Sequence, residues 1–69
     1  MIPKIKSKDI CIKYNIPNIG NKYTKISICK YIHDHNRSYS LSTLLHIDNY
    51  SLECIVQHIH ENLWHTNKK

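Results

Sequence analysis

Residues 52–63 read LECIVQHIHENL and form the most regular stretch of this sequence. Apolar side chains recur in it at intervals of three and four residues, which is the spacing of one face of an α-helix. We expect a helix that is capped by Asn49 or Ser51, ends near Trp64 and buries one apolar stripe, with its polar residues largely off that stripe. The stripe consists of Leu52, Ile55, Val56, Ile59 and Leu63.

A shorter helix is expected near the N-terminus, over residues 8–15, with Ser7 as its N-cap. Pro17 excludes the residue before it from the helical conformation, so the helix has to stop there. Gly20 reaches positive φ without strain, and we expect the turn to cover residues 17–20. The inward face of this first helix consists of Ile10, Cys11 and Tyr14.

Two more helices are expected in the middle of the chain. One starts at a cap provided by Asn21 or Thr24 and runs to about His35, before the helix-breaking residues 36–38. The other is a short helix over residues 41–45, opened by Ser40. The inward face of the longer helix consists of Ile28, Cys29 and Ile32. The predicted architecture is therefore mainly α, a compact bundle of about four short helices.

The whole chain, residues 1–69, is expected to form a single domain, with residues 1–6 as an N-terminal tether and residues 65–69 as a polar tail. A core of this size supplies a net stability of only about 3–5 kcal/mol and leaves little room for a catalytic pocket. The net charge of +5 favours acidic partners such as nucleic acid. The lysines are scattered, however, and a charged surface that keeps the protein in solution explains them equally well.

The first residues lack the apolar region of a secretory signal, and no stretch approaches the roughly 20 apolar residues of a membrane span. Three cysteines leave at least one thiol unpaired, which is typical of a reducing compartment. We therefore expect an intracellular protein without a membrane partner. The abundance of Ile, Lys and Asn is typical of AT-rich genomes, such as those of parasites, endosymbionts and large DNA viruses.

Six histidines and three cysteines raise the question of a metal site. A structural zinc site usually presents a close pair of ligands. No two cysteines are close in the sequence, and the histidines at 33 and 35, or at 58 and 60, point about 200° apart around a helix. We expect no metal, histidines on the surface and thiols in the core. The thiols expected in the core are those of Cys11, Cys29 and Cys54.

Enzymatic activity is not expected either. A single glycine cannot build a glycine-rich phosphate loop, and no nucleophile signature surrounds any cysteine. The five acidic residues lie near predicted helix ends or on polar faces. The sequence therefore predicts a binding protein without a catalytic residue or a cofactor.

Residues 28–36, ICKYIHDHN, resemble the Ile-Trp-x-Tyr-Ile-Lys-x-His-Asn stretch of SWIB domains. Residues 7–11, with Pro17 and Gly20, resemble the first helix and turn of that family. Residues 41–45, LSTLL, resemble its Leu-x-x-Leu-Leu piece, and the last helix is similar to the one that closes the family's fold. Only residues 37–40 remain of a strand-forming stretch in the family, so its small sheet is expected to be missing or reduced to at most a vestigial β-hairpin.

The resemblance implies a protein-interaction module of chromatin or transcription, in a fold shared with ubiquitin ligases that hold an amphipathic helix of a tumour suppressor. A partner helix would lie in an apolar groove between the helices. Each residue expected in this groove could equally belong to a closed core. The candidates are Tyr14, Tyr31, Leu44, Ile55, Ile59 and Trp64.

Two alternatives stay open. Residues 10–32 also resemble the SAP-like helix-turn-helix, which implies direct binding of DNA by a basic surface. The third alternative is a structural subunit of an oligomer or a virion, in which the apolar stripe is covered by a partner chain. The candidate nucleic-acid contacts are Lys8, Lys13, Lys22, Lys25, Lys30 and Arg37.

Overall fold

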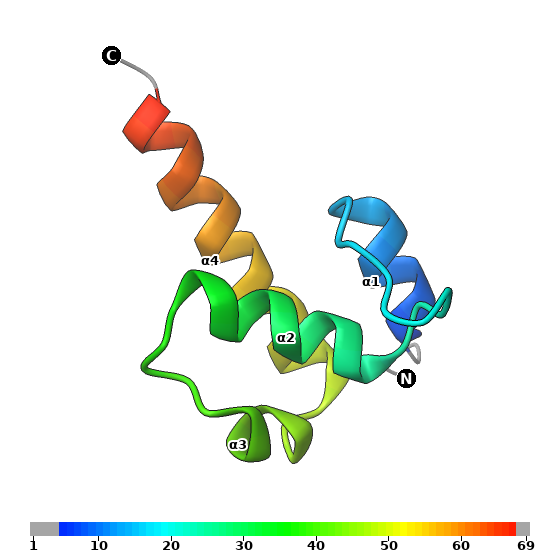
Figure 1. The fold of residues 1–69 in the computed structure, drawn as a ribbon. Coiled ribbons are helices and arrows are strands. Elements are labelled where there is room, and N and C mark those ends of the chain that lie inside the picture. Colours follow the sequence, from blue (N-terminus) through cyan, green and yellow to red (C-terminus); the bar gives the residue numbers. More distant parts are fainter. Residues whose placement is uncertain (1–4, 68–69) are drawn as a thin grey trace, which may run out of the picture.

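The computed structural model describes the backbone of residues 5–67 and the side chains of residues 5–62. Within this range the chain forms four helices and no β-strand longer than an isolated bridge (Figure 1). The helices are α1 (Ser7–Lys13), α2 (Lys25–His35), α3 (Leu41–Leu45) and α4 (Asn49–Asn67). The prediction of a mainly α fold, a compact bundle of about four helices, is confirmed.

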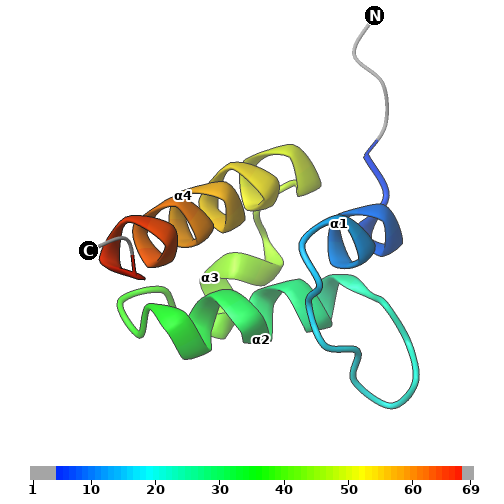
Figure 2. The same ribbon diagram turned by 90° about the horizontal axis from the view of Figure 1, so that it is seen from above.

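Helix α2 is the central element, because it packs against α1, α3 and α4. In Figure 2, α2 and α4 lie side by side and run in the same general direction, with α1 at one end of the pair. The last turns of α4 extend beyond the other helices (Figure 1). The helix continues to Asn67, past Trp64, so the predicted helix end is wrong.

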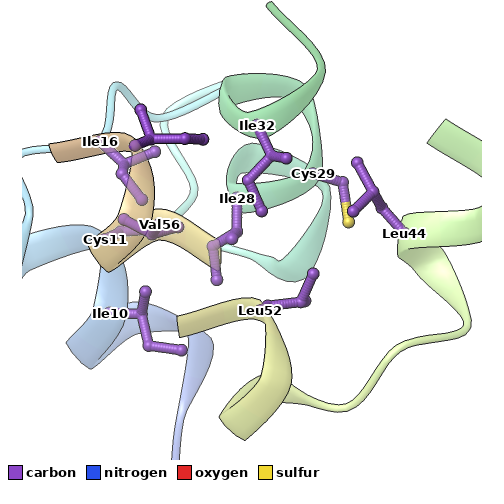
Figure 3. Close-up of a cluster of buried hydrophobic side chains, with 10 residues drawn as sticks. Ile10, Cys11, Ile16, Ile28, Cys29, Ile32, Leu44, Leu52 and Val56 are labelled. Carbon is purple, nitrogen blue, oxygen red and sulfur yellow. The ribbon is translucent and has the colours of Figure 1, made fainter. Parts of the chain in front are cut away.

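The core is formed where the apolar faces of the four helices meet (Figure 3). The adjacent pairs predicted for the inward faces of the first two helices, Ile10–Cys11 and Ile28–Cys29, are buried. Leu52 and Val56 of the predicted stripe are buried as well. Ile55 is half-buried, and the side chain of Leu63 lies outside the described residues. The buried apolar residues are Ile10, Cys11, Ile16, Ile28, Cys29, Ile32, Leu44, Leu52, Val56 and Ile59.

Cys54 is exposed, so the prediction of three core thiols is wrong for this residue. Successive residues of an α-helix point about 100° apart, and Cys54 is two positions from both Leu52 and Val56. It therefore lies on the side of α4 away from those buried neighbours. Its position next to an isoleucine in the sequence therefore does not make it buried.

Side-chain caps start two of the helices. Ser40 Oγ accepts a hydrogen bond from Thr43 N at 3.3 Å, which confirms the predicted start of α3. In α4 the cap is Asp48, which precedes both predicted caps, Asn49 and Ser51, since Asp48 Oδ1 accepts a hydrogen bond from Ser51 N at 3.2 Å. Hydrogen bonding from the Ser51 side chain, and then from its backbone N–H, lowers the pKa of the Asp48 carboxyl.

Asn49 and Ser7 have another role than the predicted capping. Asn49 Nδ2 donates to Ile5 O at 2.7 Å, and Ser7 Oγ donates to Asn49 Oδ1 at 3.5 Å. Lys6 is the N-cap residue of α1, without a side-chain cap bond. The two contacts of Asn49 tie the start of α1 to the start of α4.

Helix α1 ends at Lys13, and Asn15, two residues before Pro17, adopts the left-handed conformation with φ 55°. The hydrogen bonds are those of a Schellman motif, from Ile16 N to Cys11 O at 2.8 Å and from Asn15 N to Ile12 O at 3.4 Å. Ile16 and Cys11, which are joined by the first of these hydrogen bonds, are both buried. The helix end is therefore anchored in the core.

A tight turn follows in the connection between α1 and α2. Ile19 and Lys22 form an isolated antiparallel bridge, with hydrogen bonds of 3.2 Å in both directions. Gly20 has φ 61° and Asn21 has φ 63°, the positive values that a type I′ turn requires at both central residues. Asn21 therefore shares the positive φ that was expected of Gly20. The short hairpin formed by this turn lies before α2 and not in residues 37–40.

Candidate functional site

Tyr14 and Tyr31, two of the predicted groove residues, both contact His60 of α4. The Tyr31 hydroxyl lies 2.9 Å from His60 Nε2. The ring of Tyr14 meets the imidazole edge-on, with ring centroids 5.2 Å apart. Since Tyr14 follows α1 and Tyr31 belongs to α2, His60 joins three helices at one point.

The prediction that the histidines lie on the surface is wrong for His60, which is half-buried. The residue lies four positions after Val56 and next to Ile59, at the edge of the buried stripe. Residues four apart are neighbours on a helix surface, so this position is the signal that could have located it. His60 is half-buried there, and its ring contacts the rings of Tyr14 and Tyr31.

Glu53 completes the contacts of Tyr14. Its Oε2 accepts hydrogen bonds from the Tyr14 hydroxyl at 3.0 Å and from Lys13 Nζ at 3.2 Å. The hydrogen bond to Glu53 is the main cause of a raised pKa of the Lys13 ammonium. The polar atoms of Tyr14 and Tyr31 are therefore both engaged within the chain.

The remaining predicted groove residues are divided. Leu44 is fully buried and belongs to the core, because a groove wall has to be accessible to a partner. Ile59 is 9% exposed and Ile55 is half-buried. The side chain of Trp64 lies outside the described residues. The structure thus brings Tyr14 and Tyr31 together through His60 and encloses Leu44.

The predicted nucleic-acid contacts also fall into two groups. Lys13 is paired with Glu53, and Lys30 Nζ lies 2.9 Å from Asp34 Oδ1 one turn further along α2. The hydrogen bond from Lys30 is the main cause of a lowered pKa of the Asp34 carboxyl. In the described part of the chain no ion pair involves the other four, and all but the half-buried Lys25 are exposed. These four are Lys8, Lys22, Lys25 and Arg37.

A hollow that was not predicted lies beside α1. It has a volume of about 440 Å³ and lies between α1 and the extended connection that leads to α2, which is the cyan loop in Figure 2. Two large apolar side chains at its edge are well exposed, Ile12 at 55% and Tyr23 at 39%. The lining residues are Cys11, Ile12, Asn15, Ile16, Pro17, Asn18 and Tyr23. We call this space the loop hollow.

Two residues of the sequence, Ile12 and Tyr23, are weak signals of the loop hollow. Ile12 is an apolar residue off the predicted inward face of the first helix, and Tyr23 is an aromatic residue in a connection. Each alone is an ordinary exposed residue. Only the course of the loop places them around one space.

A second, smaller hollow of about 90 Å³ shares Pro17 with the loop hollow as a lining residue. Tyr31 lines it from α2, and the ion pair between Lys30 and Asp34 lies at its edge. Burial raises the pKa of the Tyr31 hydroxyl, which favours its neutral form in the folded protein. This space is much smaller than the loop hollow.

Metal binding and thiol chemistry have little basis in the described residues. Among them, no three His, Cys, Asp or Glu side chains come together in a group that could hold a metal ion. Burial raises the pKa of the Cys11 and Cys29 thiols, which disfavours the reactive thiolate. None of the helices, over the range described, is long and apolar enough to cross a membrane.

Comparison of the chain with protein-family models, with curated proteins and with solved structures finds no match.

Proposed function

We propose that this chain is a non-catalytic nucleic-acid-binding module and that its binding surface is formed by α1, α2 and the connection between them. The observation that carries the proposal is the charge of this segment. Residues 10–33 contain no acidic side chain, and their charged residues are Lys13, Lys22, Lys25 and Lys30. Phosphates are the natural partners of such a surface.

Two of these lysines are available for phosphate contacts. In the described part of the chain, Lys22 and Lys25 form no ion pair. The tight turn holds the backbone of Lys22 through its bridge to Ile19, and Lys25 is the first residue of α2. Helix α2 has no acidic residue in its first turn, so the positive end of its dipole adds to the charge of the two lysines.

The alternative of a groove for a partner helix has less support from the geometry. A helix that entered between α1, α2 and α4 would have to displace Tyr14 and Tyr31 from His60. Each of these contacts would be lost before the partner contributed any of its own. The contacts therefore favour a structural role for the two tyrosines and a surface role for the lysines.

The test compares two double variants with the same change of net charge. Lys22→Gln/Lys25→Gln removes the unpaired lysines, whereas Lys13→Gln/Lys30→Gln removes those held by Glu53 and Asp34. Affinity for a fluorescent oligonucleotide is measured by anisotropy between about 50 and about 200 mM salt. We expect the affinity to fall steeply with salt concentration. The slope of log affinity against log salt concentration should decrease by the equivalent of about two phosphate contacts in the first variant and stay unchanged in the second.

Circular dichroism spectra of both variants serve as the control for folding. Equal losses of affinity in the two variants, or binding that does not respond to salt, would contradict the proposal. Binding of a protein partner that fails when Tyr31 is truncated, and survives both lysine variants, would favour the groove instead.

A further inference from the structure

The loop hollow offers a mixed lining of apolar and amide side chains. Ile12, Pro17 and Tyr23 supply apolar and aromatic surface, and Asn15 and Asn18 supply one side-chain amide each. In the part of the chain that the structure describes, neither amide makes a side-chain hydrogen bond. Each amide can both donate and accept, so two pairs of hydrogen-bonding groups are available to a ligand.

The lining is held in place by the backbone around it. The Schellman motif at the end of α1 fixes Asn15 in its left-handed conformation and anchors Ile16 in the core. The bridge between Ile19 and Lys22 then holds the residue that precedes Tyr23. The hollow is therefore preorganised, which lowers the entropy cost of binding a ligand in it.

The charge around the loop hollow is positive. Lys22, which forms no ion pair in the described residues, precedes Tyr23 in the sequence, whereas the nearby Lys13 is paired with Glu53. No acidic residue lines the hollow. An anionic chain that carries flat, polar-edged rings is complementary to this combination in both charge and shape.

We propose that the loop hollow receives one unpaired base of a single-stranded nucleic acid, an inference that rests on the proposed nucleic-acid binding. The ring of Tyr23 stacks on the face of the base. The amides of Asn15 and Asn18 contact its edge, as amides do at bases elsewhere. Lys22 contacts the adjoining phosphate. A base in a duplex is stacked and paired on these same surfaces, so the chain prefers single strands.

The test uses three DNA probes of the same length: a single strand, the same strand with abasic sites, which carries the same phosphate charge, and its duplex, which has about twice that charge density. Tyr23→Ala is compared with Tyr50→Ala, since Tyr50 is a 60% exposed tyrosine of α4 that does not line the hollow. We expect Tyr23→Ala to weaken binding of the intact single strand about tenfold. Its binding of the abasic strand, and all binding by Tyr50→Ala, should stay unchanged. Tyr23→Phe keeps the ring and should bind like the natural chain.

The outcomes separate this inference from the proposed function. Equal, salt-dependent binding of intact and abasic strands would overturn the base site and leave nucleic-acid binding in place. Absence of binding to every oligonucleotide would overturn both. Tyr23-dependent binding of an acidic peptide, with no preference for intact over abasic strands, would overturn the base site and assign the hollow to a protein partner.

Discussion

Replacement of Leu52 by alanine should remove most of the stability of this small domain. Leu52 is 0% exposed in the core between α2 and α4, so the substitution deletes three buried carbon atoms. At about 0.8 kcal/mol per buried methylene the lost transfer energy is about 2.4 kcal/mol, and the cavity left behind brings the cost to about 3–5 kcal/mol. A domain of this length has only about 3–5 kcal/mol to lose.

Leu45→Ala is the matched control, because Leu45 is also a helical leucine but is 42% exposed. The same atoms are deleted from a site that leaves no enclosed cavity, and we expect a cost of about 1 kcal/mol. Urea denaturation followed by far-ultraviolet circular dichroism gives both values from the shift of the midpoint. Similar midpoints for the two variants, or a larger loss for Leu45→Ala, would refute the assignment of the core.

Two further predictions concern ionisable side chains. In the native chain, Cys54 should react with a thiol reagent at the rate of an exposed cysteine, while Cys11 and Cys29 should react only on unfolding. A Cys54→Ser variant that keeps the fast reaction would disprove this. Stability should fall as the pH rises above about 9–10, because the raised pKa values of Tyr31, Cys11 and Cys29 make the folded state hold protons that the unfolded state releases. Urea denaturation at increasing pH measures the decline, which should be shallower in Tyr31→Phe; stability that is constant or rises would contradict the assigned burial.

Local features of the fold could be predicted because their causes are close together in the sequence. The spacing of apolar residues located the four helices, and Ser40 marked the start of α3 through a hydrogen bond to a backbone group three residues away. The end of α1 was harder to place. Pro17 indicated a stop, but the helix ends earlier because Asn15 adopts the left-handed conformation that closes the Schellman motif.

The resemblance to SWIB domains led to a groove hypothesis that depended on long-range arrangement. Spacing along a helix shows which residues share a face, but it does not show whether that face is open or covered. Leu44 was expected at a groove and is fully buried. Tyr31 was expected there as well, and its hydroxyl is bonded to a histidine 29 residues away. The same pattern of residues is compatible with either outcome.

The sequence by itself determined the helices and most of the core, since periodicity and short-range hydrogen bonds act within a few residues. Only the tertiary structure decided which charges are free and where a ligand could enter. Lys13 is paired with Glu53, 40 residues away, while Lys22 has no such partner in the described residues. The loop hollow likewise depends on how residues 16–23 pass beside α1. The ion pair joins segments that are 40 residues apart, and the hollow depends on the path of the loop back past α1. Neither follows from the spacing of residues along a single helix.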